Sequence, residues 1–168
     1  RQGCEGAERT LDSCGGLVCQ QANLRVIGCT FTIGVANASW IQFDEGLMIV
    51  IGGWFHANRA LDRPGVAAGA KSGTFVMNSC VFSTLAADFV HVDLGKGCMF
   101  NIDNVTLTKA TGDKLSYSKP FIQAHSGSRG AISNVVAIPV AGGELFHIEQ
   151  GATVSYQSLQ APNWRLPN

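Results

Sequence analysis

The sequence has 168 residues and a formal net charge of zero, and this neutral balance argues against a nucleic-acid-binding protein, which would carry a basic excess. Charged residues make up 14% of the chain and hydrophobic residues 46%, a profile that excludes intrinsic disorder and fits one domain with a buried core. No apolar run reaches the roughly 18 to 20 residues that span a bilayer, so we expect no membrane insertion.

Residues 1–23 are predicted to form a lead-in segment rich in cysteine and glycine. The six cysteines are Cys4, Cys14 and Cys19 in this segment and Cys29, Cys80 and Cys98 in later apolar strands. The first three could form a disulfide or stay free, whereas the last three are interpreted as small buried hydrophobic residues. Because no Cys-x-x-Cys pair occurs, a zinc site has no support, and we expect no metal and no cofactor.

A seven-residue motif, x-(I/V/F)-(Q/H)-x-(D/H/E)-x-G, recurs along the chain. Its copies are residues 40–46, 89–95, 121–127 and 145–151. A second apolar strand follows each glycine, and the predicted ends of these strands are Phe31, Phe55, Phe82, Leu107, Ile138 and Leu159. A period of roughly 20 to 30 residues with two or three short strands is typical of a β-solenoid. The sequence therefore predicts an all-β fold, a right-handed parallel β-helix of about six coils over residues 24–160.

Apolar and polar residues alternate in each copy, as in a strand with one buried face. The alternation predicts two inward columns, Ile41, Val90, Ile122 and Phe146 beside Phe43, Val92, Ala124 and Ile148. In the second strand it predicts an inward column of Cys29, Gly53, Cys80, Val105, Val136 and Gln157. A buried row of polar side chains that bond one another should accompany it, formed by Asn78, Asp103 and Asn134.

The outward side of the first strand is predicted to carry stacked polar side chains. One column is Gln42, His91, Gln123 and His147, and another is Asp44, Asp93, His125 and Glu149. An apolar edge on the same side is expected from Trp40, Phe89, Phe121 and Leu145. In coil order, His125 should lie between Asp93 and Glu149. Farther along, Trp54 is expected to point outward, and Trp164, in a tail of residues 161–168, to cap the open end of the solenoid.

The inward apolar columns, the row of Asn78, Asp103 and Asn134, and the strand ends resemble the pectin-lyase-like β-helix superfamily. The irregular coils and glycine-rich loops are most similar to bacteriophage tailspike and tail-fibre β-helices. The resemblance spans roughly Leu24 to Leu159 and is architectural, so no catalytic residue is carried over. It implies a homotrimer on a virion, in contact with other virion proteins, that binds and sometimes cleaves bacterial surface polysaccharide.

Three functions fit these patterns. The first is a virion structural or adhesion module, whose candidate glycan or subunit contacts are Trp40, Gln42, Trp54, Phe89, Phe121, Gln123 and His147. The second is a polysaccharide lyase or glycoside hydrolase, because two carboxylates can serve as acid and base. Its candidate catalytic residues are Asp44, His91, Asp93, His125 and Glu149. The third is a capsid decoration protein without a receptor role.

Overall fold

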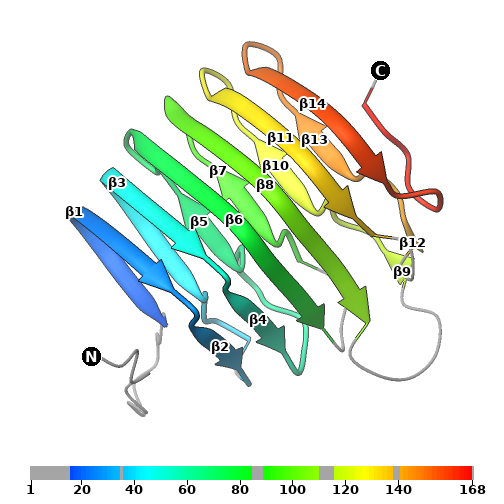
Figure 1. Ribbon diagram of the computed structural model, residues 1–168, viewed down its shortest axis with the longest axis horizontal. Coiled ribbons are helices and arrows are strands. Elements are labelled where there is room, and N and C mark those ends of the chain that lie inside the picture. The colour runs from blue at the N-terminus through cyan, green and yellow to red at the C-terminus, as the bar shows by residue number, and fades with distance from the viewer. Residues whose placement is uncertain (1–15, 35, 85–88, 110–115, 138–140, 168) are drawn as a thin grey trace.

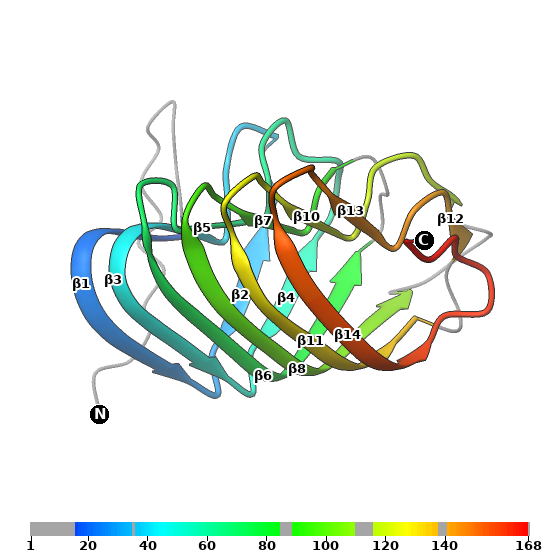
Figure 2. The ribbon, with the colours of Figure 1, turned by 90° about the horizontal axis from the view of Figure 1, so that it is seen from above.

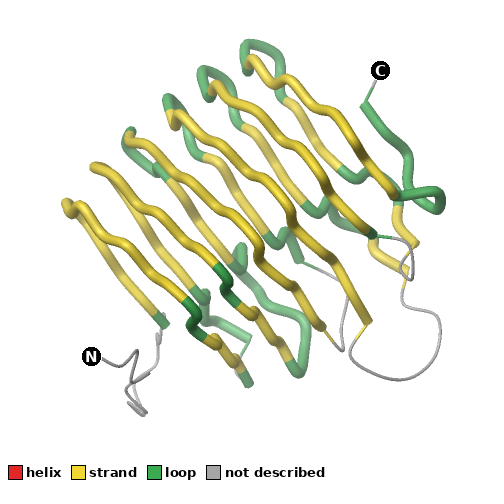
Figure 3. Tube along the Cα trace, in the orientation of Figure 1, coloured by secondary structure: helices red, strands yellow, loops and turns green. Residues whose placement is uncertain are grey.

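The structure is a computed structural model that describes residues 16–34, 36–84, 89–109, 116–137 and 141–167. Within these ranges every regular element is a β-strand, so none of them forms a helix that could cross a membrane (Figure 3). The strands pair in parallel, and the chain winds into a β-solenoid of about five turns (Figure 1). The predicted fold class is confirmed.

Three faces surround the core (Figure 2). Face A consists of four short strands, β5 (Val66–Ala68), β7 (Val92–Leu94), β10 (Ile122–Ala124) and β13 (Phe146–Ile148). The first residues of the long strands β1 (Leu17–Ile27) and β3 (Ile41–Ile51) complete this face. Face B holds one long strand per coil: β1 (Leu17–Ile27), β3 (Ile41–Ile51), β6 (Gly73–Thr84), β8 (Cys98–Lys109), β11 (Arg129–Val136) and β14 (Thr153–Gln160). Face C contains β2 (Thr30–Ile33), β4 (Trp54–Ala57) and the far ends of the later long strands.

The solenoid begins inside the segment that was expected to lead into it, since β1 starts at Leu17. A separate small sheet pairs β9 (Ser116–Tyr117) with β12 (Ala141–Gly142). At the other end, Trp164 is buried and its ring lies against Gly142, while the backbone of Arg165 pairs with Gly143 and Leu145. Trp164 therefore caps the last coil, as expected.

A residue in the left-handed backbone conformation marks the corner between faces B and C in every coil. These residues are Gly28, Gly52, Ser79, Asn104, Asn134 and Ser158, with φ between 53° and 66°. The corner interrupts the two-residue alternation of inward and outward side chains. After it, Val135 pairs with buried Val105 in one neighbouring strand and with Leu159 in the other, so Val135 and Leu159 continue the inward column. The expected inward positions Val136 and Gln157 are therefore wrong, because the corner residue and not the strand end sets the register. The predicted strand end at Ile138 lies outside the described residues.

Of the predicted row, Asn78 and Asp103 pair in register, but Ser133 and not Asn134 is the third member; Asn134 is the corner residue that follows, and none of these side chains is fully buried. The Asp103 carboxylate accepts hydrogen bonds from Asn78 Nδ2 at 3.3 Å, Ser133 Oγ at 2.6 Å and Asn134 Nδ2 at 2.7 Å. The bonds from Ser133 and Asn134 are the main reason that the pKa of Asp103 is lowered. These hydrogen bonds link three coils at the surface.

The core is rich in aromatic rings. Phe55 stacks between Phe31 and Phe82, with ring centroids 5.0 Å and 4.8 Å away. Trp40 packs on the same stack and is fully buried, as are Phe121 and Leu145. The expected outward apolar edge is therefore wrong. Its first position lies at a bend, where the consecutive amides of Trp40 and Ile41 both donate to Gly65 O, and such a bend places two successive side chains inside.

The cysteines fall into two groups. Cys80 and Cys98 are buried and free, as expected of small hydrophobic residues. Cys29 is only half-buried and is disulfide-bonded, which corrects the expectation that it is a buried thiol. Cys19 is a free thiol, whereas Cys4 and Cys14 lie outside the described residues.

Candidate functional site

The second copy of the motif, residues 89–95, is shifted by two residues from its predicted register. In face A, Val66 pairs with Val92, and Val92 pairs with Ile122, so Val90 is not the first inward residue of this coil. The sequence offers two glycines here, and Gly97, with φ of 77°, is the one that turns the chain. Gly95 instead packs against the backbone of Gly69. The shift moves Asp93 into the outward column of Gln42, Gln123 and His147.

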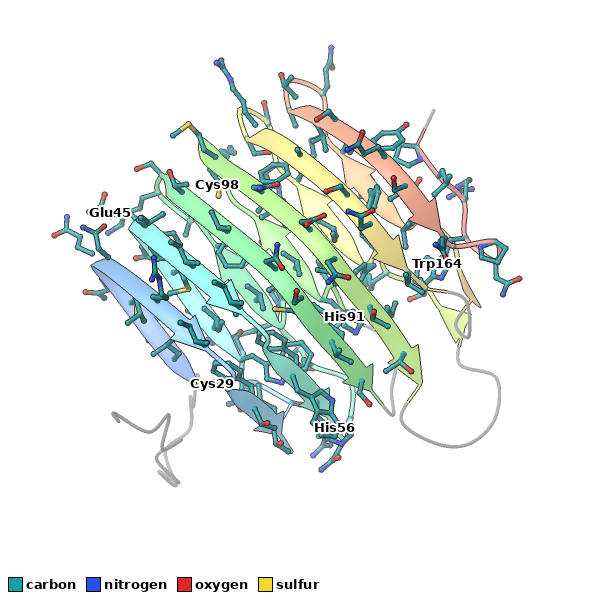
Figure 4. The ribbon with its side chains drawn as sticks, in the orientation of Figure 1. Cys29, Glu45, His56, His91, Cys98 and Trp164 are labelled. Atoms are coloured by element: carbon teal, nitrogen blue, oxygen red, sulfur yellow. The ribbon has the colours of Figure 1, made fainter. Side chains whose placement is uncertain are left out.

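His91 is the residue most affected by this shift, because it points into the core and is fully buried (Figure 4). Its ring stacks on Phe89, with centroids 4.3 Å apart, and the Phe82 and Phe121 rings lie 5.8 Å and 5.3 Å away. Burial lowers the pKa of His91 to about 3. Neither His91 nor its neighbour Phe89 can touch an external substrate, so both expected outward roles are wrong.

Asp93, His125 and Glu149 come together on the outer surface, on three successive coils. His125 Nε2 lies 2.9 Å from Asp93 Oδ1, and His125 Nδ1 lies 2.7 Å from Glu149 Oε1. The Ser126 backbone amide donates to Glu149 Oε2 at 3.0 Å. The expected neighbours are therefore in contact. We call these three residues the His125 cluster.

The two carboxylates of the His125 cluster have different environments. Burial raises the pKa of Asp93, against the opposing effect of His125. The amide of Ser126 and then the His125 side chain lower the pKa of Glu149. Both ring nitrogens of His125 thus face a carboxylate oxygen, one from each neighbouring coil. Among the described residues, no set of three His, Cys, Asp or Glu side chains is arranged to hold a metal ion.

Two members of the His125 cluster, His125 and Glu149, lie on a longer polar edge, the corner between faces A and B, and Asp93 adjoins this edge on face A. Toward the first coils this edge carries Gln21, whose side-chain amide donates to Glu45 Oε1, and Lys71, whose ammonium lies 3.7 Å from Asp44 Oδ2. Figure 4 places Glu45 at this edge near the first coils. We define the polar edge by residues Gln20, Gln21, Asp44, Glu45, Lys71, Ser72, Lys96, His125, Ser126, Glu149 and Gln150.

Two open grooves lie at the first coils of the polar edge. One, of about 750 Å³, is lined by Val18, Cys19, Gln20, Gln21 and Lys71. The other, of about 570 Å³, is lined by Gln21, Asn23, Glu45, Gly46 and Ser72. The sequence reasoning missed the contribution of Gln20, Gln21 and Asn23, because β1 lacks a copy of the motif and lies largely in the predicted lead-in segment. The alternation of polar and apolar residues in Asn23-Leu24-Arg25-Val26 was the sequence signal that could have revealed a strand here.

The other predicted contact residues are spread over separate surfaces. Gln42 and Gln123 are half-buried on the outside of face A. His147 is exposed there, and its Nδ1 lies 3.1 Å from Glu144 Oε2. Trp54 points outward as expected, with 52% of its surface exposed, but it lies on face C. It cannot share a ligand contact with the polar edge unless the ligand wraps around the solenoid.

The His125→Ala variant is expected to lose about 1 kcal/mol of folding stability, because two partly exposed contacts between coils disappear together. Urea denaturation at neutral pH measures the loss. The matched control is His147→Ala, since the contact of His147 is with Glu144, only three residues away. Equal losses in the two variants would show that the His125 cluster does not tie the coils together.

Comparison with protein-family models, curated proteins and solved structures found no match to this chain.

Proposed function

We propose that the chain is a virion adhesion module of the tail-fibre or tailspike type, and that it binds bacterial surface polysaccharide along the polar edge without cleaving it. The observation that carries this proposal is the repetition of hydrogen-bonding side chains at one corner, from Gln21 in β1 to Gln150 before β14. Neighbouring coils are separated by roughly 4.8 Å, so a polymer lying along the edge meets similar groups at regular intervals. Amides and carboxylates match the donors and acceptors of sugar hydroxyls.

The His125 cluster supports a binding role better than a catalytic one. Asp93 and Glu149 both direct an oxygen at the same imidazole, and Glu149 also accepts the amide of Ser126. A general acid must instead direct its proton at the leaving-group oxygen of the substrate. These contacts hold three coils in register and present fixed polar groups to a ligand.

A glycoside hydrolase or lyase is the second candidate function. It is favoured by one observation, the displacement of the two carboxylate pKa values in opposite directions, upward for Asp93 and downward for Glu149. Enzymes that use one carboxyl group as an acid and another as a base show this separation. A ligand that displaced the His125 side chain would leave the carboxyl groups of Asp93 and Glu149 available as the acid and the base.

Incubation with a panel of bacterial capsular and lipopolysaccharide chains distinguishes the two functions. We expect the protein to bind at least one member, measured by co-sedimentation or biolayer interferometry, without releasing new reducing ends or unsaturated uronates. Asp93→Ala and Glu149→Ala should produce no change in product, because none forms. If the unmodified protein forms such a product and both variants fail to form it, the adhesion proposal is wrong and the enzyme proposal takes its place.

We further propose that the module assembles as a homotrimer through a patch where faces B and C meet. Ile27 and Ile51 are partners in adjacent strands and are 60% and 37% exposed, and Trp54 follows on the next face. Large exposed apolar side chains that lie together are typical of subunit contacts. The patch lies away from the polar edge, so assembly would leave the edge open to a polysaccharide.

Light scattering on the Trp54→Ser variant tests this assembly. We expect the unmodified protein to have three times the 17.8 kDa mass of one chain and the variant to dissociate, because Trp54 supplies the largest apolar contact of the patch. Met99→Ser is the matched control, since Met99 is 58% exposed on face B outside the patch. A stable monomer before any substitution would contradict the trimer.

A further inference from the structure

We propose that the two grooves at the first coils of the polar edge form one site, the edge groove, which takes a neutral saccharide unit. This inference rests on the proposed adhesion function and assigns its main contact to residues of β1, β3 and the loop before β6. The grooves adjoin, because Gln21 lines both and because Lys71 and Ser72 are neighbours in the chain.

The edge groove exists because one loop is longer than the two beneath it. Three residues connect the paired positions Phe43 and Leu47, and three connect Cys19 and Asn23. In the next coil five residues, 69–73, connect the matching positions Ala68 and Thr74. The extra length rises above the turns of β1 and β3, at the left of Figure 2. It forms a wall that carries Lys71 and Ser72.

The backbone holds this wall in place. The amides of Gly69 and Ala70 donate to Phe43 O at 2.7 Å and 3.3 Å. The amides of Lys71 and Ser72 both donate to Asp44 O at 3.2 Å, and the Lys71 ammonium lies near the Asp44 carboxylate. A preorganised groove loses less conformational entropy on binding than a loop that must order around its ligand.

The side chains of the edge groove select an uncharged, hydroxyl-rich ligand. Gln20, Gln21 and Asn23 supply amides, which both donate and accept, and Ser72 adds a hydroxyl. Two charged side chains line the groove, Glu45 and Lys71, and the Asp44 carboxylate beside Lys71 leaves no excess of positive charge there. A site for a uronate or a phosphate would instead offer an excess of cations. A neutral saccharide therefore fits the chemistry better than an acidic one.

The groove is open, so one unit should bind weakly, with a Kd on the order of 1 mM. Repeated units of a polymer that contact several chains of an assembly would raise the effective affinity by 10²-fold or more. The tests therefore use long polysaccharide chains on the full assembled protein.

Two variants remove the edge groove in different ways. Gln21→Ala deletes an amide that lines both halves, and Ser72→Trp fills the groove from its wall. Asn101→Ala is the matched control, because Asn101 is exposed on face B outside the polar edge. Thermal melts of all three establish that the solenoid is folded before binding is measured.

Biolayer interferometry against immobilised neutral O-chain polysaccharide and against alginate, a polyuronate, provides the measurement. We expect the protein to bind the neutral chains in preference to alginate, with at least a tenfold loss in Gln21→Ala and in Ser72→Trp and none in Asn101→Ala. Neutral-chain binding that survives both groove variants would overturn this site and leave the adhesion function standing. A preference for alginate would overturn the ligand class. Failure to bind any polysaccharide would overturn the adhesion function as well.

Discussion

Acidification from neutral pH to pH 4 is expected to destabilise the protein strongly, and the His91→Gln variant is expected to lose most of that sensitivity. His91 is fully buried among aromatic rings, and its pKa in the folded protein is lowered to about 3. In the unfolded chain it titrates near 6.5. Between these two values the unfolded state binds more protons, so the free energy of unfolding falls as the pH falls. The full difference amounts to about 4 to 5 kcal/mol and is reached only below pH 3, whereas the part lost between pH 7 and pH 4 is about 3 kcal/mol.

Urea unfolding curves at pH 7, 5.5 and 4 measure this effect. The Gln side chain is neutral throughout, so the variant should lose stability on acidification only through its carboxylates. A second variant, His91→Leu, lacks any titrating or hydrogen-bonding group and controls for the amide that Gln introduces into the core. The readout is the change in stability with pH, which separates titration from packing. If both variants keep the steep acid dependence of the unmodified protein, His91 is not buried as a neutral group.

The Gly95→Ala variant is expected to lose about 3 kcal/mol of stability, three times as much as Gly97→Ala. A Cβ at residue 95 would lie 2.4 Å from Gly69 O and 2.8 Å from Gly69 C, and backbone of the adjacent coil cannot move aside. A Cβ at residue 97 would meet nothing within 4 Å. Only the φ of 77° penalises it, by about 1 kcal/mol. Differential scanning calorimetry of the two variants measures the contrast.

This pair of variants also decides the register of the coil that contains β7 and β8. In the register that the motif alone suggests, Gly95 would be the turn residue in open space. In that case Gly97→Ala would lose at least as much folding stability as Gly95→Ala. Equal or reversed losses of stability would mean that the motif-based register is correct. His91 would then lie at the surface, and Asp93 would not belong to the outward column of Gln42, Gln123 and His147.

The sequence motif was sufficient for the fold and for most of the His125 cluster. Alternation in two clear copies, 121–127 and 145–151, placed His125 and Glu149 on adjacent coils, and Asp93 came within reach of His125 despite its misassigned register. Two glycines separated by one residue, Gly95 and Gly97, made the copy at residues 89–95 ambiguous, because either could end the motif. The choice depends on the backbone of Gly69 in the preceding coil, which no local pattern contains.

Three further features depended on contacts that alternation does not encode. The left-handed corner residues are Gly, Ser or Asn in different coils, so no single residue type marks the corner. After each corner, the alternation of inward and outward side chains starts again from a different residue. The bend at Trp40 and Ile41 buries two successive side chains, so the apolar edge expected at the surface became part of the core. The edge groove depends on the length of the loop at residues 69–73 relative to two other coils.

Hydrogen exchange with and without bound polysaccharide tests most directly the claim that the polar edge is the binding surface. Deuterium uptake is compared for the protein alone and with the panel member that binds best. We expect slower exchange at residues 19–23, 44–46 and 69–73, weaker slowing at 125–127 and 149–151, and no change in β2 or β4. Slowing confined to face C around Trp54, with the polar edge unchanged, would contradict the account.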